Sequence, residues 1–396
     1  MKRFILSVAF MGYALGATPL IELALKNNYD LKVLEEQKAA LMQEVDLSKV
    51  WENPRLGIGA KDIFFDEPLK RDTGTQNEFL ELSQKIPMGS KLDIKASIAQ
   101  QNVAVKSLEI QDKKLDITNS IISLQYTLGR IDADMQTLLR YNKLLVDLKA
   151  AHLAYSSTVN AHYNQTLSNT ILEKNIAILQ KSLEREKGSV LHKLESIINM
   201  PVSDDAKIAL HMISYTTSNE EATLKEHNPK LLLQKIQTQK ELNNLHYEKA
   251  QKIPDVTVAL GYNHRESRDD MWYLSFSIPL PIYGRENLAI RKAELTQNAS
   301  EQSENALQNK LVYDLQDELL NKELQSEKIS LNQGILEENR RIYDNILSTA
   351  FSQNDALVRL LSNLTTSLDT ELKINTLILS YDLACLKINY LLGELS

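Results

Sequence analysis

The sequence predicts a mainly α-helical chain that is written twice, with one β-hairpin in each copy. Three observations lead to this fold class. The 396 residues include only 12 glycines and 9 prolines, and so few breakers over so long a chain favour long helices. A series of landmarks recurs in the same order about 200 residues further on. Between two landmarks of each copy, apolar and polar residues alternate with the period of a β-strand.

The first element, residues 1–17, has the pattern of an export signal. Lys2 and Arg3 supply the positive charge, residues 4–15 form an apolar stretch of about a dozen residues, and two small residues follow. A short buried helix is the alternative interpretation. No later stretch approaches the roughly 18 uncharged apolar residues of a spanning helix. The exported chain is therefore expected to be periplasmic, secreted or an outer-membrane β-barrel protein.

Charge and cysteine content exclude some classes of protein. The formal net charge is −7 and no basic patch is present, which argues against nucleic acid as a partner. The single cysteine, Cys385, cannot form an internal disulfide. No cysteine lies near residue 17, where the export signal would be cleaved, so we expect no lipid anchor on the new N-terminus.

The duplication rests on five pairs of landmarks. They are residues 27–31 and 227–231, Pro54 and Pro254, residues 86–91 and 280–285, residues 154–156 and 350–352, and residues 194–199 and 388–393. Five landmarks in one order are hard to obtain by chance. We therefore predict a first structural repeat at residues 18–201, a linker at 202–217 and a second repeat at 218–396.

Each repeat is expected to carry one β-hairpin, at residues 55–86 and 255–280. Strands are expected at 55–65 and 78–86 in the first hairpin. In the second hairpin, apolar residues alternate with small or polar ones. We predict that the apolar residues face lipid: Val256, Val258, Leu260, Trp272, Leu274 and Phe276. A soluble hairpin packed on a helix would show the same alternation, but the export signal and the duplication favour a membrane barrel. Four strands cannot close a barrel, so several chains must share one, and three would supply twelve strands.

Proline and glycine mark the expected hinges between strands and helices, which are Pro54, Pro87, Gly89, Pro254, Pro281 and Gly284. Beyond the hinges, residues 91–153 and 285–349 contain no proline and are rich in helix formers, so each is expected to be one long helix. The second carries an apolar stripe with an 11-residue period, which suits a nearly straight helix: Leu320, Leu324, Leu331, Ile335, Ile342 and Ile346. The shorter segments 19–50 and 157–200, placed end to end, would match one long helix in length.

Several motifs resemble those of the TolC-type outer-membrane efflux proteins. Residues 228–231 are similar to the family's helix-start signature, and residues 277–285 to its strand-to-helix transition. Residues 341–343, followed by Ala350, Ser352 and Asp355, are similar to its periplasmic-tip motif. The resemblance runs from about residue 19 to residue 393. The chain departs from the family where Ala350 replaces a usual glycine, where the first tip at 154–163 matches poorly, and where many relatives have a lipidated N-terminal cysteine.

The resemblance implies a homotrimer, in which a twelve-stranded β-barrel in the outer membrane is continued by a long α-helical barrel of coiled coils across the periplasm. Such a duct is passive, is not an enzyme and uses no cofactor. Its expected partners are outer-membrane lipid, a periplasmic adaptor and an inner-membrane pump such as an RND or ABC transporter, with small drugs or metal cations as cargo. A periplasmic coiled-coil adaptor or structural interaction protein without a barrel is the alternative.

The periplasmic tip is expected where the long helices end, at Ala154 and Ser156 in one repeat and at Ala350, Ser352 and Asp355 in the other. Small residues there would let helices approach closely. Three copies of Asp355 near the axis would form an acidic ring that selects cations, although a surface charge on a helix is an equal alternative. The sequence contains no His-x-x-x-His, Cys-x-x-Cys, phosphate loop or nucleophile elbow, so we expect no metal or catalytic site.

Overall fold

The computed structural model describes residues 18–66, 68, 75–155, 159–203, 206–215, 219–266, 268–349 and 356–394. The proposed export signal at residues 1–17 lies outside this part of the chain. The helices are α1 (Thr18–Asn27), α2 (Tyr29–Leu47), α3 (Lys91–Tyr155), α4 (Val159–Ile198), α5 (Glu220–His227), α6 (Pro229–Ala250), α7 (Arg285–Thr349) and α8 (Ala356–Leu392). The strands are β1 (Arg55–Lys61), β2 (Asn77–Ile86), β3 (Val256–His264) and β4 (Met271–Ser277).

The two long helices match the sequence prediction closely. Helix α7 has the predicted bounds and α3 ends two residues later than predicted, so each has 65 residues. The N-terminal segment of each repeat is broken at an asparagine, which the prediction of a single helix at 19–50 missed. Asn28 separates α1 from α2, and its side chain accepts a hydrogen bond from the amide of Leu31 at 3.1 Å. Asn228 separates α5 from α6 in the same way, and its side chain donates to the carbonyl of Leu391 at 2.8 Å.

The chain folds into two compact units, and each draws on both of the predicted repeats. Of the described residues, unit 1 contains those in 18–32, 111–228 and 309–394, and unit 2 contains those in 33–110 and 229–308. The packing units therefore cut across the sequence repeats, because helices α3 and α7 each contribute residues to both units.

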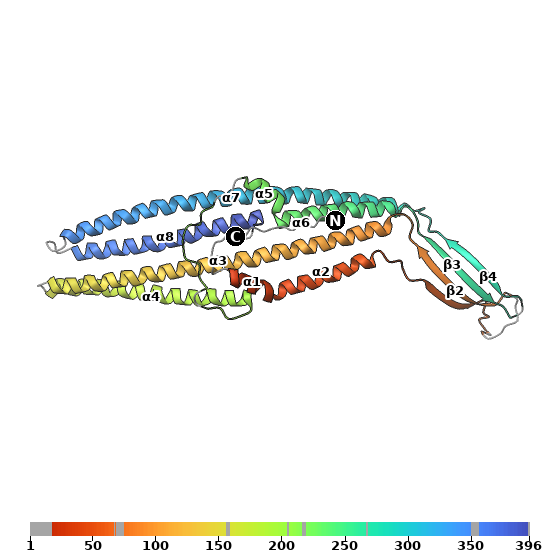
Figure 1. Cartoon of the computed structure of the whole chain (residues 1–396), viewed down its shortest axis with the longest axis horizontal. Helices are drawn as coiled ribbons and strands as arrows, with labels where there is room; N and C mark the ends of the chain where they lie inside the picture. Colours follow the sequence, from red (N-terminus) through yellow and green to blue (C-terminus); the bar gives the residue numbers. More distant parts are fainter. Residues whose placement is uncertain are drawn as a thin grey trace. The chain divides into compact units, whose positions relative to one another are not determined.

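Unit 2 contains one antiparallel sheet with the strand order β1-β2-β3-β4 (Figure 1). The pairing of β2 with β3 joins the two repeats in a single sheet. Polar contacts tie the adjacent helices together: Asn243 of α6 donates to Ser97 and Gln101 of α3 at 3.1 and 3.0 Å. On the other side of α6, Thr238 contacts Ser300 of α7 at 3.2 Å.

Unit 1 is a helical body whose core comes from residues distant in sequence. Ile122 and Tyr126 of α3 pack with Leu386 of α8 and with Ile208 of the segment between the repeats. A second cluster joins Ile329 of α7 to Tyr381 and Cys385 of α8. The heptad-spaced leucines of α8, Leu361, Leu364 and Leu368, are buried, as expected for a seam between packed helices.

Candidate functional site

The strand register gives the sheet one apolar face and one polar face. Two rows of the apolar face cross all four strands: Leu56, Leu82, Leu260 and Leu274, and then Ile58, Leu80, Tyr262 and Trp272. Seven of these side chains, all except that of Tyr262, are 46–76% exposed, as is Phe276 on the same face. So large an exposed apolar surface marks a site of contact with another molecule or with lipid.

All six residues predicted to face lipid lie on this apolar face. Leu260, Trp272, Leu274 and Phe276 are exposed, whereas Val256 and Val258, near the hinge, are half-buried. Strand β1 is shorter than predicted and ends at Lys61. The reason is Asp62, whose φ of 59° is left-handed and ends the ladder.

On the polar face, an aromatic ring covers a glycine in each hairpin. Phe79 lies over Gly59, its direct partner across the β1–β2 pair, and Tyr273 lies over Gly261 across the β3–β4 pair. A Cβ added to Gly261 would lie 2.2 Å from the Cζ atom of Tyr273. The Tyr273 hydroxyl continues across β3 and donates to a carboxylate oxygen of Glu81 on β2 at 2.6 Å. This bond links the second repeat to the first.

The two outer strands leave the sheet open. Strands β1 and β4 stand at its edges, and no described strand pairs with the outer side of either. An open edge of unpaired backbone groups cannot remain in a lipid environment. If the apolar face contacts lipid, both edges must therefore be paired by other chains.

The predicted hinge residues flank the junctions between strands and helices. Pro54 directly precedes β1, Pro254 lies two residues before β3, and Pro87 directly follows β2. Gly89 and Gly284 have φ angles of 72° and 69° just before α3 and α7. Only glycine adopts this left-handed conformation without strain, so both positions constrain how the strand turns into the helix.

Between the two hairpins, a buried ion pair fixes the junction. Lys91, the first residue of α3, is 4% exposed, and its Nζ lies 2.6 Å from an oxygen of Asp255, which directly precedes β3. Burial alone would raise the pKa of the Asp255 carboxyl, but hydrogen bonds from Lys91 and from the Met88 amide hold that pKa below its usual value. Lys85 extends the network, since it lies 3.4 Å from Asp255 and 3.2 Å from Glu52.

In unit 1, the segment between the repeats lies across α3 and α8. Residues 206–215, here called the linker strap, receive a hydrogen bond from Gln125 and donate one back to its carbonyl, at 3.0 and 3.2 Å. A Cβ added to Gly129 of α3 would lie 1.9 Å from the carbonyl oxygen of Ile208, so the strap needs a glycine beneath it. At its other end, the amide of Ile213 donates to Oδ1 of Asp382 at 3.0 Å.

Asp382 is the most perturbed carboxyl of this unit. The residue is fully buried, and its second oxygen has no hydrogen-bond partner among the described residues. Burial raises the pKa of Asp382 to about 6, although the Ile213 amide and the charge of His211 oppose the rise. Burial likewise raises the pKa of Tyr126 and Cys385 beside it, to about 12 and about 11.

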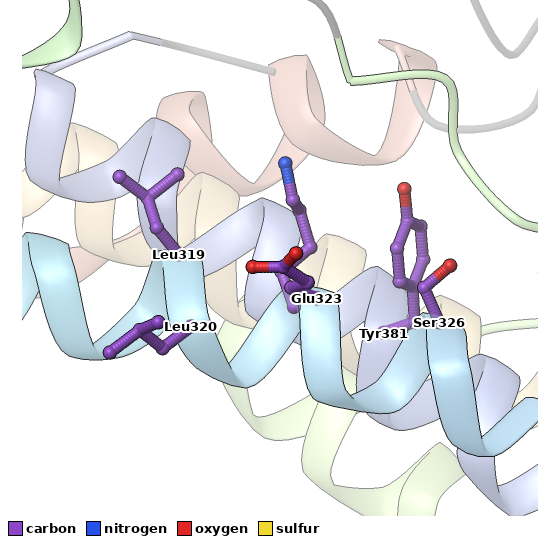
Figure 2. Close-up of a pocket in the computed structure, with 6 residues that line it drawn as sticks. Leu319, Leu320, Glu323, Ser326 and Tyr381 are labelled. Atoms are coloured by element: carbon purple, nitrogen blue, oxygen red, sulfur yellow. The ribbon is translucent and has the colours of Figure 1, made fainter.

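The apolar stripe of α7 faces outward from the chain. Leu320, Leu324 and Leu331 are 47–69% exposed, whereas the helix buries Leu311, Leu315 and Ile329. A shallow groove of about 410 Å³ lies beside this stripe, lined by α7 residues and by Tyr381 of α8. Figure 2 shows the side chains that line it. Among its lining residues, the Lys322 ammonium lies 4.3 Å from the ring centroid of Tyr215. The stripe is therefore available for contact with another molecule.

Ser156, Ala350, Ser352 and Asp355 lie outside the described residues, and Ala154 lies at the end of α3 without a described side chain. In the described part of the chain, no group of three or more His, Cys, Asp or Glu residues could hold a metal ion. None of the helices in that part is long and apolar enough to cross a membrane.

Comparison with known proteins decides the family. Residues 222–393, nearly the whole second repeat, match the family described as outer membrane efflux protein. The second half of the chain therefore belongs to the outer membrane efflux protein family. The family consists of efflux channels of the outer membrane that extend into the periplasm, and its members are not enzymes.

Solved structures extend the similarity of fold to the first half of the chain. The open state of the MtrE outer membrane channel of Neisseria gonorrhoeae is 13% identical with a TM-score of 0.79, covering 96% of this chain and 89% of that one. CusC is 15% identical with a TM-score of 0.75, covering 96% and 92%. VceC of Vibrio cholerae is 16% identical with a TM-score of 0.71, covering 96% of both. The predicted TolC-type fold is thus confirmed, and no curated protein sequence matches the chain.

Proposed function

We propose that three copies of this chain form a passive exit duct, with a shared twelve-stranded barrel in the outer membrane and a helical tunnel in the periplasm. A periplasmic adaptor and an inner-membrane pump of the RND or ABC class deliver the cargo. The cargo class is small drugs or metal cations. The pump supplies the energy, because the duct itself has no catalytic or nucleotide-binding motif.

The exposed apolar face of the sheet carries this proposal. Each large apolar side chain kept in water forgoes about 1.5–3 kcal/mol relative to burial, and at least eight such side chains are exposed on one sheet. Lipid on that face removes the cost. The opposite face, with serine, glycine and glutamate, suits a water-filled interior.

The open edges of the sheet support the number of copies. Four strands per chain are too few to close a membrane barrel, which needs at least about eight. Pairing β4 of one copy with β1 of the next removes every edge, and three copies give twelve strands. The exposed stripe on α7, which includes Leu320 and Leu331, would be covered in the same assembly by a neighbouring helix.

The test begins with extraction from outer membranes. We expect the protein to require detergent, to have the mass of a trimer by native mass spectrometry, and to conduct ions in a planar lipid bilayer. A stable folded monomer that is released without detergent would contradict the proposal and favour the periplasmic adaptor. The cargo is tested separately, by deleting the gene and measuring accumulation of a fluorescent dye and of copper or zinc ions. Unchanged accumulation of both kinds of cargo would refute the cargo assignment.

A further inference from the structure

The hinge between the two hairpins can be compared with the hinge that assembly would create between copies. This comparison rests on the proposed trimer, in which β4 of one copy pairs with β1 of the next. Inside the chain, Ile86, which precedes Pro87, pairs with Val256, which lies two residues after Pro254. Between copies, the residue before Pro281 is Leu280, and the residue two positions after Pro54 is Leu56. The corresponding register therefore pairs Leu280 with Leu56 of the neighbouring copy.

The two faces of the sheet agree with this register. Moving along both strands from Leu280 and Leu56 places Ile278 opposite Ile58, and Phe276 opposite Ala60, of the neighbouring copy. Leu56 and Ile58 lie on the apolar face, as does Phe276. A shift of one residue would instead have placed apolar residues opposite polar ones. Ile278 and Leu280 are 49% and 74% exposed, as expected for an edge that a neighbour covers.

The charges at the two kinds of hinge differ. Within the chain, Lys91 begins α3 and binds Asp255, the residue after Pro254, at 2.6 Å. Between copies, the matching positions are Arg285, which begins α7, and Arg55, the residue after Pro54. An attractive pair inside the chain thus corresponds to two arginines at the seam between copies.

Neither arginine has an acidic partner within the described part of its own chain. Both are exposed, and neither forms an ion pair there. Two acids close to Arg55 in sequence or in strand register have other partners, since Glu52 contacts Lys85 at 3.2 Å and Glu81 accepts a hydrogen bond from Tyr273 at 2.6 Å. Glu286 follows Arg285, but adjacent helical residues point about 100° apart.

We infer that Arg285 of one copy and Arg55 of the next bind an anion between their two guanidinium groups at each of the three seams, where no carboxylate like that of Asp255 neutralises the helix-start cation. Two guanidinium groups offer planar, multiple donors that suit an oxyanion such as a phosphate or carboxylate. The N-terminus of α7 adds a favourable dipole. The anion comes from the water-filled side, because Arg55 lies on the polar face, in the row of Ser83, Ala259 and Ser275.

The probe for this site is inorganic phosphate. At millimolar concentration, it should raise the temperature at which the detergent-solubilised trimer dissociates by several degrees, whereas chloride of the same ionic strength should not. Arg55→Gln and Arg285→Gln should each abolish the response. Arg291→Gln is the matched control, because Arg291 is an exposed arginine of α7 that pairs with Glu294 of its own chain at 3.1 Å. Its response to phosphate should equal that of the parent.

Charge exchange tests the seam geometry independently of the anion. Arg55→Asp should recreate the Lys91–Asp255 arrangement between copies, so the trimer should dissociate at a higher temperature without phosphate and should no longer respond to it. A lower dissociation temperature for Arg55→Asp would overturn the inferred seam. A short-chain phosphatidylglycerol should not replace phosphate; equal protection by this lipid would place the site on the membrane side and overturn the aqueous assignment.

Native mass spectrometry distinguishes failure of the proposed trimer from failure of the anion site. A monomer would refute the proposed assembly. An intact trimer whose stability is the same with phosphate as with chloride would leave the assembly standing and refute the anion site alone.

Discussion

Leu274 and Ser275 are neighbours on β4 that face opposite sides of the sheet, and lysine substitutions at the two positions test which side meets lipid. Leu274 is 60% exposed, occupies the middle of the strand and lies opposite Leu260. Ser275 lies opposite Ala259 on the polar face. Both substitutions add the same charge and the same side chain, so each is the control for the other.

The expected costs follow from depth and face. A lysine on the lipid side near the bilayer midplane destabilises a barrel by about 2–4 kcal/mol, and a trimer would carry three such lysines. Leu274→Lys should therefore cost on the order of 10 kcal/mol per trimer if the copies act independently. Ser275→Lys places its ammonium in water and should cost less than about 1 kcal/mol per copy.

Urea unfolding in phospholipid vesicles, followed by far-UV circular dichroism, measures the difference. Leu274→Lys should lower the midpoint concentration or prevent insertion, while Ser275→Lys should unfold close to the parent. Equal midpoints for the two variants would refute the assigned faces, and a larger cost for Ser275→Lys would show that the faces are reversed.

Three further predictions concern other parts of the chain. Gly261→Ala should displace the Tyr273 ring and destabilise the barrel by about 1–3 kcal/mol in the same urea assay, whereas Gly57→Ala, with 3.8 Å of clearance, should be tolerated. Because burial raises the pKa of Asp382 from 3.8 to about 6, stability in urea should fall by up to about 3 kcal/mol as pH rises through that interval, and Asp382→Asn should remove the dependence; an unchanged pH profile would contradict this. Asp355→Asn should lower cation preference in planar bilayers and Asp355→Lys should lower it further, and parental selectivity in both would place Asp355 on an outer face.

Much of this architecture could be predicted because its signals are local and repeated. The absence of proline and the helix-forming composition were sufficient for the bounds of α7. The alternation that includes Leu274 and Ser275 predicts the second hairpin at residues 255–280, and β4 lies within that range. No proline marks the break at Asn28; instead the Asn28 side chain accepts a hydrogen bond from the Leu31 amide and begins α2 as a separate helix.

The residues that sequence reasoning missed depend on contacts between distant segments. Lys91 and Asp255 are 164 positions apart, so no local pattern pairs them. The duplication could have indicated this pair, because Lys91 and Asp255 each follow a predicted hinge proline within a few residues. The sequence gives no sign that Asp382 is buried, because a lone acid in an amphipathic helix usually lies at the surface. Its contact with Ile213 of the linker strap depends on a segment 169 positions away.

The division of each compact unit between the two repeats has a consequence for biogenesis. Unit 1 is built from residues 111–228 packed with residues 309–396, so it cannot fold completely until almost the whole polypeptide has been exported. Contacts between such distant segments slow folding, and the sheet exposes its apolar face during the delay. We therefore expect the unfolded chain to need holding chaperones until residues 309–396 have been exported. Neither half, released alone, would have the partners that it needs to survive proteolysis.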